Sequence, residues 1–295
     1  MSKNQTLAGV GFGLGAYGIW GFFPLFFRQL GAVQPLDVLC NRAVWGCVFV
    51  SLILSAKGHW GPTLAVFERP WLVARLGLAA LLVGSNWLAF LWAVDQHQVM
   101  ASSLGYFLTP LVNVLLGMLV LRERLSRLEW ASVGLALLAL VNEFVALGSL
   151  PWISLFLGGS FGLYGLVRKQ VPVDAIAGLW LETLSLMPLL AVYWAWQAQA
   201  GHAVFTGFDT TTQALLPLAG VLTALPLMLF AAATQRLNLA TVGMLMYINP
   251  TMQLLTAVWL FDEPLAPARL VSFGLIWSGL LLYSLSGWRR YRRGG

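Results

Sequence analysis

The chain has 295 residues, of which 59% are hydrophobic and only 9% are charged, and its mean hydropathy is +0.79. Soluble domains carry about 25% charged residues, so this composition excludes a soluble fold and indicates a protein embedded in lipid. The formal net charge of +6 does not indicate nucleic-acid binding, because most Lys and Arg residues lie in short gaps between apolar runs. A nucleic-acid interface needs them clustered on one solvated face.

Apolar runs long enough to cross about 30 Å of hydrocarbon as helices follow one another along the chain. The first run lacks the short core and the cleavage site of a signal peptide, so we interpret it as a retained helix. The sequence therefore predicts an all-α integral membrane protein with ten transmembrane helices. The expected spans are 7–27, 36–56, 72–94, 100–121, 128–147, 151–167, 174–196, 213–235, 240–261 and 267–287.

The basic residues are distributed unevenly between the two sides of these spans, which predicts the orientation. With a cytoplasmic N-terminus, only Arg28 and Arg269 fall outside, and Arg42 lies within a span. The cytoplasmic segments then hold Lys3, Lys57, Arg69, Arg75, Arg122, Arg124, Arg127, Arg168, Lys169, Arg236, Arg289, Arg290, Arg292 and Arg293. We expect both termini in the cytoplasm and a basic C-terminal tail that contacts anionic membrane lipid.

The second half of the chain repeats the first at an offset of 140 residues. Pro110 and Glu123 fall opposite Pro250 and Glu263, with the same spacing within each pair. Five spans in each half is an odd number, so the halves are expected to insert in opposite directions, as in inverted-repeat transporters. The expected division is a first repeat over 1–148, a second, inverted repeat over 149–288, and a tail over 289–295.

Four segments resemble the RarD branch of the EamA, or drug/metabolite transporter, superfamily. They are Ser103–Ser126 (SLGYFLTPLVNVLLGMLVLRERLS), Gly84–Asp95 (GSNWLAFLWAVD), Asn41–Trp45 (NRAVW) and Phe161–Lys169 (FGLYGLVRK). One departure is Arg122, where relatives often have Gly before the Glu. The resemblance implies ten helices in two inverted five-helix repeats, a bacterial inner-membrane location, and transport of small metabolites or drugs. RarD proteins carry a label linked to chloramphenicol sensitivity, and relatives elsewhere in the superfamily export amino acids.

Pro110 and Pro250 fall near the middle of their spans. A proline inside a helix removes one backbone hydrogen bond, and paired interruptions at matching repeat positions point to a binding site at the membrane midplane. A kink that serves only packing is the alternative. Candidate substrate-binding residues near these breaks and in the neighbouring span 72–94 are Asn86, Trp87, Tyr106, Asn113, Tyr247 and Asn249.

Arg42 and Glu182 are charged, lie within spans, and are themselves 140 residues apart. Charges inside a membrane are costly and are functional by default. We expect their long side chains to meet near the midplane. Arg42 then serves as a gate or as a site for a substrate carboxylate, and Glu182 as its counter-charge or as a proton carrier. A static structural pair, or snorkelling of each group to its nearer surface, is the alternative.

No motif for nucleotide or metal binding is present, since there is no P-loop and the three histidines are isolated. We therefore expect that the protein has no catalytic residue, metal or cofactor and is not an enzyme. The leading hypothesis is a secondary transporter that exports small organic metabolites or drugs by alternating access. Its substrate is expected to be amino-acid-like or amphipathic, and the chain a monomer or a homodimer. The alternative is a non-transporting membrane sensor or an intramembrane lipid-modifying protein.

Overall fold

The computed structural model describes residues 3–30, 33–95, 99–147, 152–199, 209–260 and 267–292, and in these it is helical with no strand. Two 3-10 turns are η1 (Arg28–Leu30) and η2 (Ala65–Glu68). The helices are α1 (Lys3–Gly21), α2 (Phe23–Phe27), α3 (Pro35–Lys57), α4 (Trp60–Leu64), α5 (Pro70–Asp95), α6 (Val99–Leu119), α7 (Arg127–Leu147), α8 (Trp152–Gln170), α9 (Ala175–Gln199), α10 (Thr210–Arg236), α11 (Leu239–Met246), α12 (Ile248–Leu260) and α13 (Pro267–Arg292).

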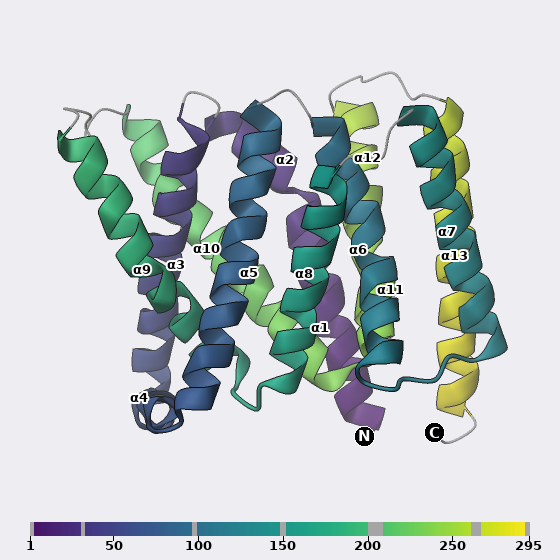
Figure 1. Ribbon diagram of the computed structural model, residues 1–295, viewed down its shortest axis with the longest axis horizontal. Helices are drawn as coiled ribbons and strands as arrows, with labels where there is room; N and C mark the ends of the chain where they lie inside the picture. The colour runs from purple at the N-terminus through teal and green to yellow at the C-terminus, as the bar shows by residue number, and fades with distance from the viewer. Residues whose placement is uncertain are drawn as a thin grey trace.

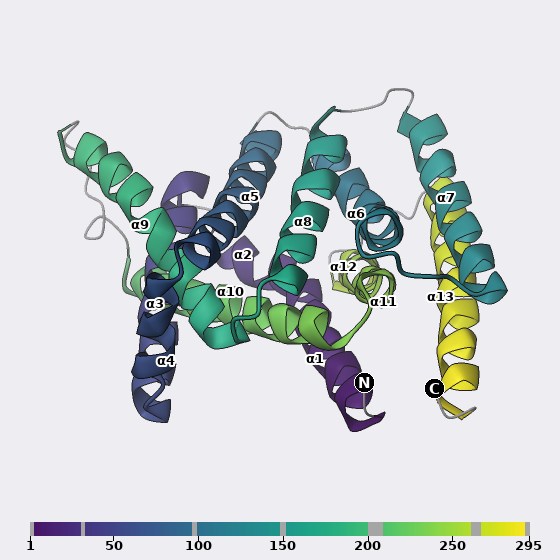
Figure 2. The same ribbon diagram turned by 60° about the horizontal axis from the view of Figure 1, so that its bottom comes forward.

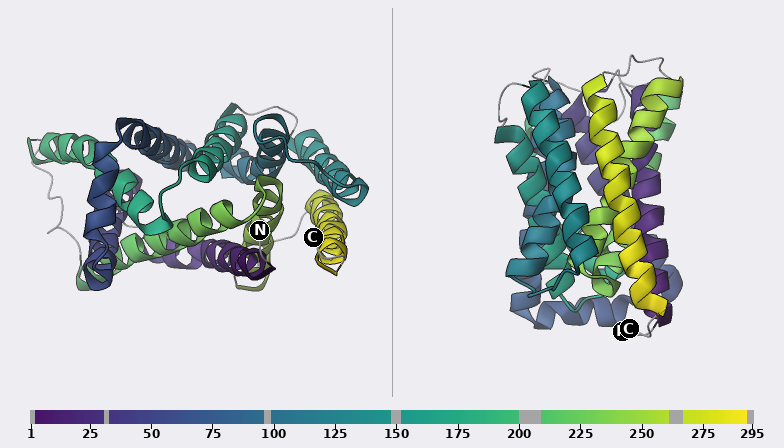
Figure 3. Two further views of the ribbon diagram at one scale, coloured as in Figure 1. Left: turned by 90° about the horizontal axis from the view of Figure 1, so that it is seen from below. Right: turned by 90° about the vertical axis from the view of Figure 1, so that its right-hand side faces the viewer.

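Most of the long helices run side by side, and both termini lie at the same end of the bundle (Figure 1, Figure 3). We call this end the termini side and the other end the opposite side. α10 crosses the bundle obliquely, whereas α7 and α13 form a pair at one edge (Figure 1). Large apolar side chains remain exposed on the outward faces, for example Val145, Val192 and Leu281 at 77%, 70% and 67%. Lipid is the environment in which such a surface is stable.

The expected spans coincide with helices. The first is divided at Phe22 into α1 and α2, and the ninth is divided at Tyr247 into α11 and α12. Within the described residues, seven helical segments are long and apolar enough to cross a membrane, and Gly105–Leu119 of α6 is a shorter apolar helix. The protein is therefore a multi-pass membrane protein, and the count of ten crossings stays a prediction.

Helices from the two halves of the chain pack against each other rather than forming separate bodies. The most extensive contacts join α6 to α8, α7 to α13, and α10 to both α3 and α1. Under the expected repeat, α1 corresponds to α8 and α5 to α10, so the α1–α10 contact has its counterpart in the contact of α8 with α5. A two-fold relation between the halves would produce this pattern, although the division into two repeats stays a prediction.

Aromatic side chains fill the centre of the bundle. Tyr17 of α1, Tyr164 of α8 and Phe230 of α10 are fully buried. The Tyr164 and Phe230 rings stack with centroids 5.7 Å apart, and Tyr17 meets Phe230 edge-on at 6.3 Å. Trp20 and Phe161 complete this group with ring centroids 5.8 Å apart. The rings join α1, α8 and α10.

Candidate functional site: an unpaired arginine and a buried ion pair

Arg42 lies about two turns into α3 from the opposite side. The ring centroids of Phe27, Trp87 and Phe23 lie 4.9, 5.0 and 5.8 Å from the carbon of its guanidinium group. Its Nε donates a hydrogen bond to Thr223 Oγ1 at 2.7 Å. The two phenylalanines belong to α2, the tryptophan to α5 and the threonine to α10, so both halves of the chain surround this group. We call these residues the Arg42 cage.

The terminal nitrogens of Arg42 have no hydrogen-bond acceptor among the described residues. Tyr106 of α6 lies close enough for its hydroxyl to interact electrostatically with the guanidinium group. The only ion pair within 4 Å in the described part of the chain joins Arg168 to Glu182. Within the described part of the chain, Arg42 is thus a cation that is solvated by aromatic faces and one hydroxyl, and no carboxylate lies within 4 Å of it.

The expected meeting of Arg42 with Glu182 is wrong. Trp180 Nε1 of α9 donates to Ser51 Oγ of α3 at 2.9 Å, which fixes how these antiparallel helices lie alongside each other. At this register Arg42 and Glu182 are about seven residues, or about 10 Å, apart along the helix axes. Glu182 instead pairs with Arg168. Each expected partner therefore belongs to a different site.

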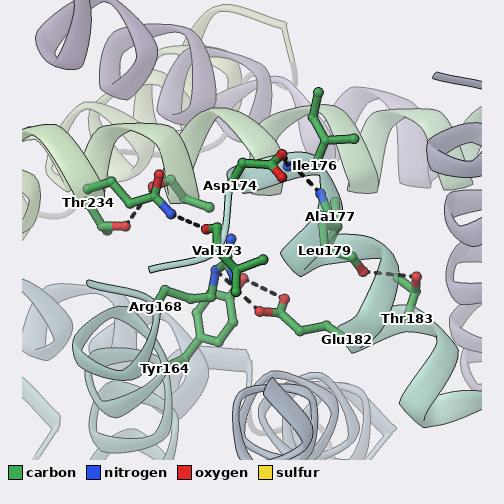
Figure 4. Close-up of polar contacts among 12 residues, drawn as sticks. Tyr164, Arg168, Val173, Asp174, Ile176, Ala177, Leu179, Glu182, Thr183 and Thr234 are labelled. Atoms are coloured by element: carbon green, nitrogen blue, oxygen red, sulfur yellow. Dashed lines mark hydrogen bonds and ion pairs between the residues drawn. The ribbon is translucent and has the colours of Figure 1, made fainter. Parts of the chain in front are cut away.

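Glu182 forms a buried cluster with two residues of α8 on the termini side (Figure 4). Arg168 Nε lies 3.2 Å from Glu182 Oε1, and the Tyr164 hydroxyl donates to Oε2 at 3.2 Å. The Arg168 and Glu182 side chains are 0% and 1% exposed. The distribution of charge along the sequence predicts Arg168 in a cytoplasmic segment between spans, not inside the bundle. The shortness of the expected span 151–167 was the one signal against this, because a helix of usual length would include Arg168.

The two prolines behave differently. α6 continues through Pro110, whereas α11 ends at Met246 and α12 begins at Ile248, just before Pro250. α11 packs beside α6, as the views in Figure 1 and Figure 2 agree. Tyr247, at the break, donates a hydrogen bond to the carbonyl oxygen of Phe107 at 3.2 Å. The break therefore lies directly against α6, one turn from Pro110.

Asn113 of α6 lies within this contact between helices. It is fully buried, and neither its Oδ1 nor its Nδ2 has a hydrogen-bond partner among the described residues. A Cβ placed at Gly162 of α8 would lie 3.4 Å from Oδ1, and one at Gly243 of α11 would lie 2.9 Å from the Asn113 Cβ. The amide is thus held against glycine backbones of the second half. Such an unpaired buried amide costs about 1–3 kcal/mol.

The candidate residues separate into groups. Asn86 and Trp87 are neighbours on α5, but only Trp87 faces Arg42. Asn86 Nδ2 is bonded to Leu157 O at 2.8 Å and to Ser160 Oγ at 2.9 Å, both on α8. The residues that meet at Arg42 are Trp87 and Tyr106. Those at the junction of α6 with α11 and α12 are Pro110, Asn113, Tyr247, Asn249 and Pro250, all of them buried.

Comparison with known proteins shows which family the chain belongs to. The model of the EamA-like transporter family matches residues 7–142. An uncharacterized transporter of Pseudomonas aeruginosa is 43% identical, covering 99% of this chain and 98% of its own length. Protein RarD of Escherichia coli is 37% identical over 99% of both chains, and chloramphenicol-sensitive protein RarD of Pseudomonas aeruginosa is 31% identical over 95% and 93%.

The chain belongs to the EamA-like transporter family, as a RarD-type member. A crystal structure that is 20% identical to this RarD-type protein shares the fold, with a TM-score of 0.73 over 97% of this chain and 99% of the other. Family membership makes it a membrane transporter of the drug/metabolite transporter superfamily rather than an enzyme.

Arg122, the departure from the RarD pattern, has a φ of 56°, and it is the only described residue other than glycine with a positive φ. Glycine adopts this left-handed conformation without strain, whereas a residue with a side chain is disfavoured there. The next residue, Glu123, accepts hydrogen bonds from the backbone N–H groups of Leu239 at 2.7 Å and Ala240 at 3.1 Å. It therefore caps α11, a structural role for the repeated glutamate in this half.

Proposed function

We propose that this RarD-type protein is a secondary transporter that exports small organic molecules bearing a carboxylate, by alternating access across the bacterial inner membrane. The observation that carries the proposal is the Arg42 cage. A membrane-embedded arginine costs at least about 2.5 kcal/mol, and contacts with aromatic faces return about 0.5–2 kcal/mol each. The terminal nitrogens of Arg42, which have no acceptor among the described residues, offer two parallel donors, the geometry that a carboxylate accepts.

The surroundings of Arg42 also limit the body of the substrate. Phe23, Phe27 and Trp87 present apolar faces beside the cation, and Thr223 and Tyr106 add hydroxyl groups. Such a site suits a small amphipathic acid or an amino-acid-like molecule, with its carboxylate on Arg42 and its apolar part among the rings.

Alternating access requires surfaces on which the two halves move. The close approach of α6 to α8 and α11 meets this need, because Gly158 and Gly162 lie against Leu108 and Val112. Glycine at such contacts lets backbones approach closely in membranes. The division of the ninth span at Tyr247 supports movement of α12 relative to α11. The expected pair of interruptions thus acts as one hinge, at the second proline.

The orientation belongs to the same proposal. Basic residues gather on the termini side, at the ends of α3 and α10 and at the start of α7. An excess of positive charge is typical of the cytoplasmic side, which supports the proposal that both termini lie in the cytoplasm. Arg42 then lies toward the exit, and the Arg168–Glu182 pair toward the entrance.

Glu182 is proposed as part of a gate at the entrance. Arg168 offsets its charge, so its separation from Arg168 accompanies opening toward the cytoplasm. The proton-carrier role is tested by comparing flux with and without a pH gradient. If Glu182→Gln keeps full gradient-dependent flux, Glu182 does not carry the proton.

The proposed function is tested by reconstitution into liposomes and a screen of amino acids, drugs and small acids. We expect at least one carboxylate-bearing compound to be moved by the wild type and not by Arg42→Gln. Arg75→Gln is the matched control, since Arg75 also lies on a ring, with its guanidinium carbon 5.3 Å from the Trp71 centroid, but is exposed. Movement only of uncharged compounds, equally in all three proteins, would overturn the proposal.

A further inference from the structure

We infer that Arg168 is a second anion-binding site, which takes a carboxylate on the cytoplasmic side and for which Glu182 substitutes in the conformation described. This inference rests on the proposed function, since it assigns to the transported anion a binding site that it occupies before it reaches Arg42. It concerns a different arginine and a different end of the molecule.

The first observation is the incomplete hydrogen bonding of Arg168. Its guanidinium group is fully buried, and among the described residues its only polar contact is the 3.2 Å approach of Nε to Glu182 Oε1. Nη1 and Nη2 have no hydrogen-bond partner in that part of the chain. They lie over the backbone of Gly178, where a Cβ would overlap the guanidinium group. A structural ion pair normally satisfies these donors with a second acceptor, and here that second acceptor is missing.

The second observation is the fit of the site to a small carboxylate. The Glu182 carboxylate is held on one oxygen by Arg168 and on the other by Tyr164. Beyond the Cβ, a glutamate side chain ends in the same two carbons as acetate. The site is therefore already shaped around a carboxylate, with a cation and a hydroxyl as its donors.

The third observation is the route to solution. A depression of about 410 Å³ opens on the termini side, lined by Lys169, Gln170, Val171, Pro172, Val173, Asp174 and Gln235. Gln235 Nε2 donates to Val173 O at 2.6 Å, and this contact closes the turn beside Arg168 (Figure 4). Asp174, the acid in the depression, is occupied in accepting from the N–H groups of Ile176 and Ala177. The depression is lined by the residues that directly follow Arg168 in the chain.

The repeat gives the fourth observation. Glu182 corresponds to Arg42 at the 140-residue offset. Toward the termini side, the Glu182 carboxylate of the protein itself pairs with Arg168, whereas at the corresponding place toward the opposite side Arg42 has no carboxylate partner among the described residues. The anion that the Arg42 site lacks is the group that the Arg168 site already holds. Glu182 therefore acts as an internal competitor that the arriving carboxylate displaces from Arg168.

The experiment removes the Glu182 carboxylate and supplies a carboxylate from solution as acetate. Glu182→Ala leaves a space the size of acetate beside Arg168. In the purified full-length variant, acetate is expected to raise the melting temperature by at least about 3 °C more than its neutral analogue acetamide. The wild type is expected to show no such difference. The rescue should disappear in Arg168→Gln/Glu182→Ala and persist in Arg42→Gln/Glu182→Ala.

Equal effects of acetate and acetamide, or a rescue that survives loss of Arg168, would overturn the inference. A rescue that depends on Arg42 instead would also overturn it while leaving the proposed function intact. If Glu182→Ala is too unstable to purify, Glu182→Gln replaces it, and the modification of Arg168 by phenylglyoxal is measured by mass spectrometry. Protection by acetate and not by acetamide is then expected, and equal modification in both contradicts the site.

Discussion

Arg42 and Arg168 both place a guanidinium group inside the helix bundle, in different surroundings. Arg168 has a carboxylate at 3.2 Å, whereas Arg42 has three aromatic rings and one hydroxyl. An ion pair balances charge within the protein, and a ring solvates a cation without neutralising it. The charge on Arg42 therefore remains, and a transported anion would neutralise it.

Two asparagines allow a matched comparison, because the side-chain amide of one makes hydrogen bonds to described residues and that of the other makes none. Asn113→Ala removes a buried amide without a partner, so we expect the melting temperature to change by less than about 2 °C while transport falls. Asn86→Ala loses two hydrogen bonds to α8, which costs about 1–2 kcal/mol, so its melting temperature should drop by about 2–4 °C. A large destabilisation by Asn113→Ala, with Asn86→Ala neutral, would show that this account of the amides is wrong.

Arg122 predicts a stabilising substitution. A residue with a side chain in the left-handed region costs about 1–2 kcal/mol, so Arg122→Gly is expected to raise stability by up to about 1 kcal/mol after the entropy cost of glycine. Arg124→Gly, whose native φ is not positive, should give no gain. Thermal melting of the two purified variants distinguishes them, and a greater gain for Arg124→Gly would contradict the assignment.

At the scale of single residues, sequence reasoning found part of the site. Arg42 was predicted because a charge within an apolar run is conspicuous, and Trp87 and Tyr106 do lie beside it. Whether these residues bind substrate stays a prediction. Arg168 was missed because it follows an apolar run at the place where a loop is expected. The depth at which a helix end is buried depends on its neighbours, which a single sequence does not show.

Among the helices, the contrast between α6 and α11–α12 is the most instructive. Both carry a proline at the same repeat position, yet only the second is divided. A proline predicts one missing hydrogen bond in either case. The division of the ninth span coincides with the contact of Tyr247 with Phe107 of α6. This tertiary interaction cannot be read from the local sequence pattern.

The approach of α11 to α6 predicts a strong effect of one added methyl group. A Cβ at Gly243 would lie 2.9 Å from the carbonyl oxygen of Pro110, so Gly243→Ala should destabilise the protein by about 1–3 kcal/mol. A Cβ at Gly134 of α7 would meet nothing within 4 Å, so Gly134→Ala should be neutral or slightly stabilising. Melting temperatures measure both, and equal shifts would contradict the close packing of these helices.

For the whole molecule, the sequence predicted helix positions well, because the thickness of a membrane imposes their length. It predicted α3, α5, α7 and α9 to within three residues at each end. The packing of helices from one half of the chain against helices from the other, such as α1 against α10, was harder to predict from the sequence. That arrangement depends on which small residues meet across helices, and leucine, alanine and glycine recur everywhere in this composition.

The orientation predicts the behaviour of reporter fusions. Alkaline phosphatase fused after Gly295 should be inactive, and fused after Gln199, at the end of α9 on the opposite side, it should be active. The cause is the excess of basic residues on the termini side. Activity of the C-terminal fusion would place the termini outside and reverse the proposed direction of entry.

In the proposed transport cycle, Arg42 holds the carboxylate of the transported molecule. The most direct measurement is the ratio of initial flux for phenylacetate to that for its neutral analogue phenylacetamide in proteoliposomes. We predict a ratio of at least about ten in the wild type, equivalent to about 1.4 kcal/mol, a smaller ratio in Arg42→Lys because a lysine lacks the forked donors, and a ratio near one in Arg42→Gln. An unchanged ratio in Arg42→Gln would contradict the claim.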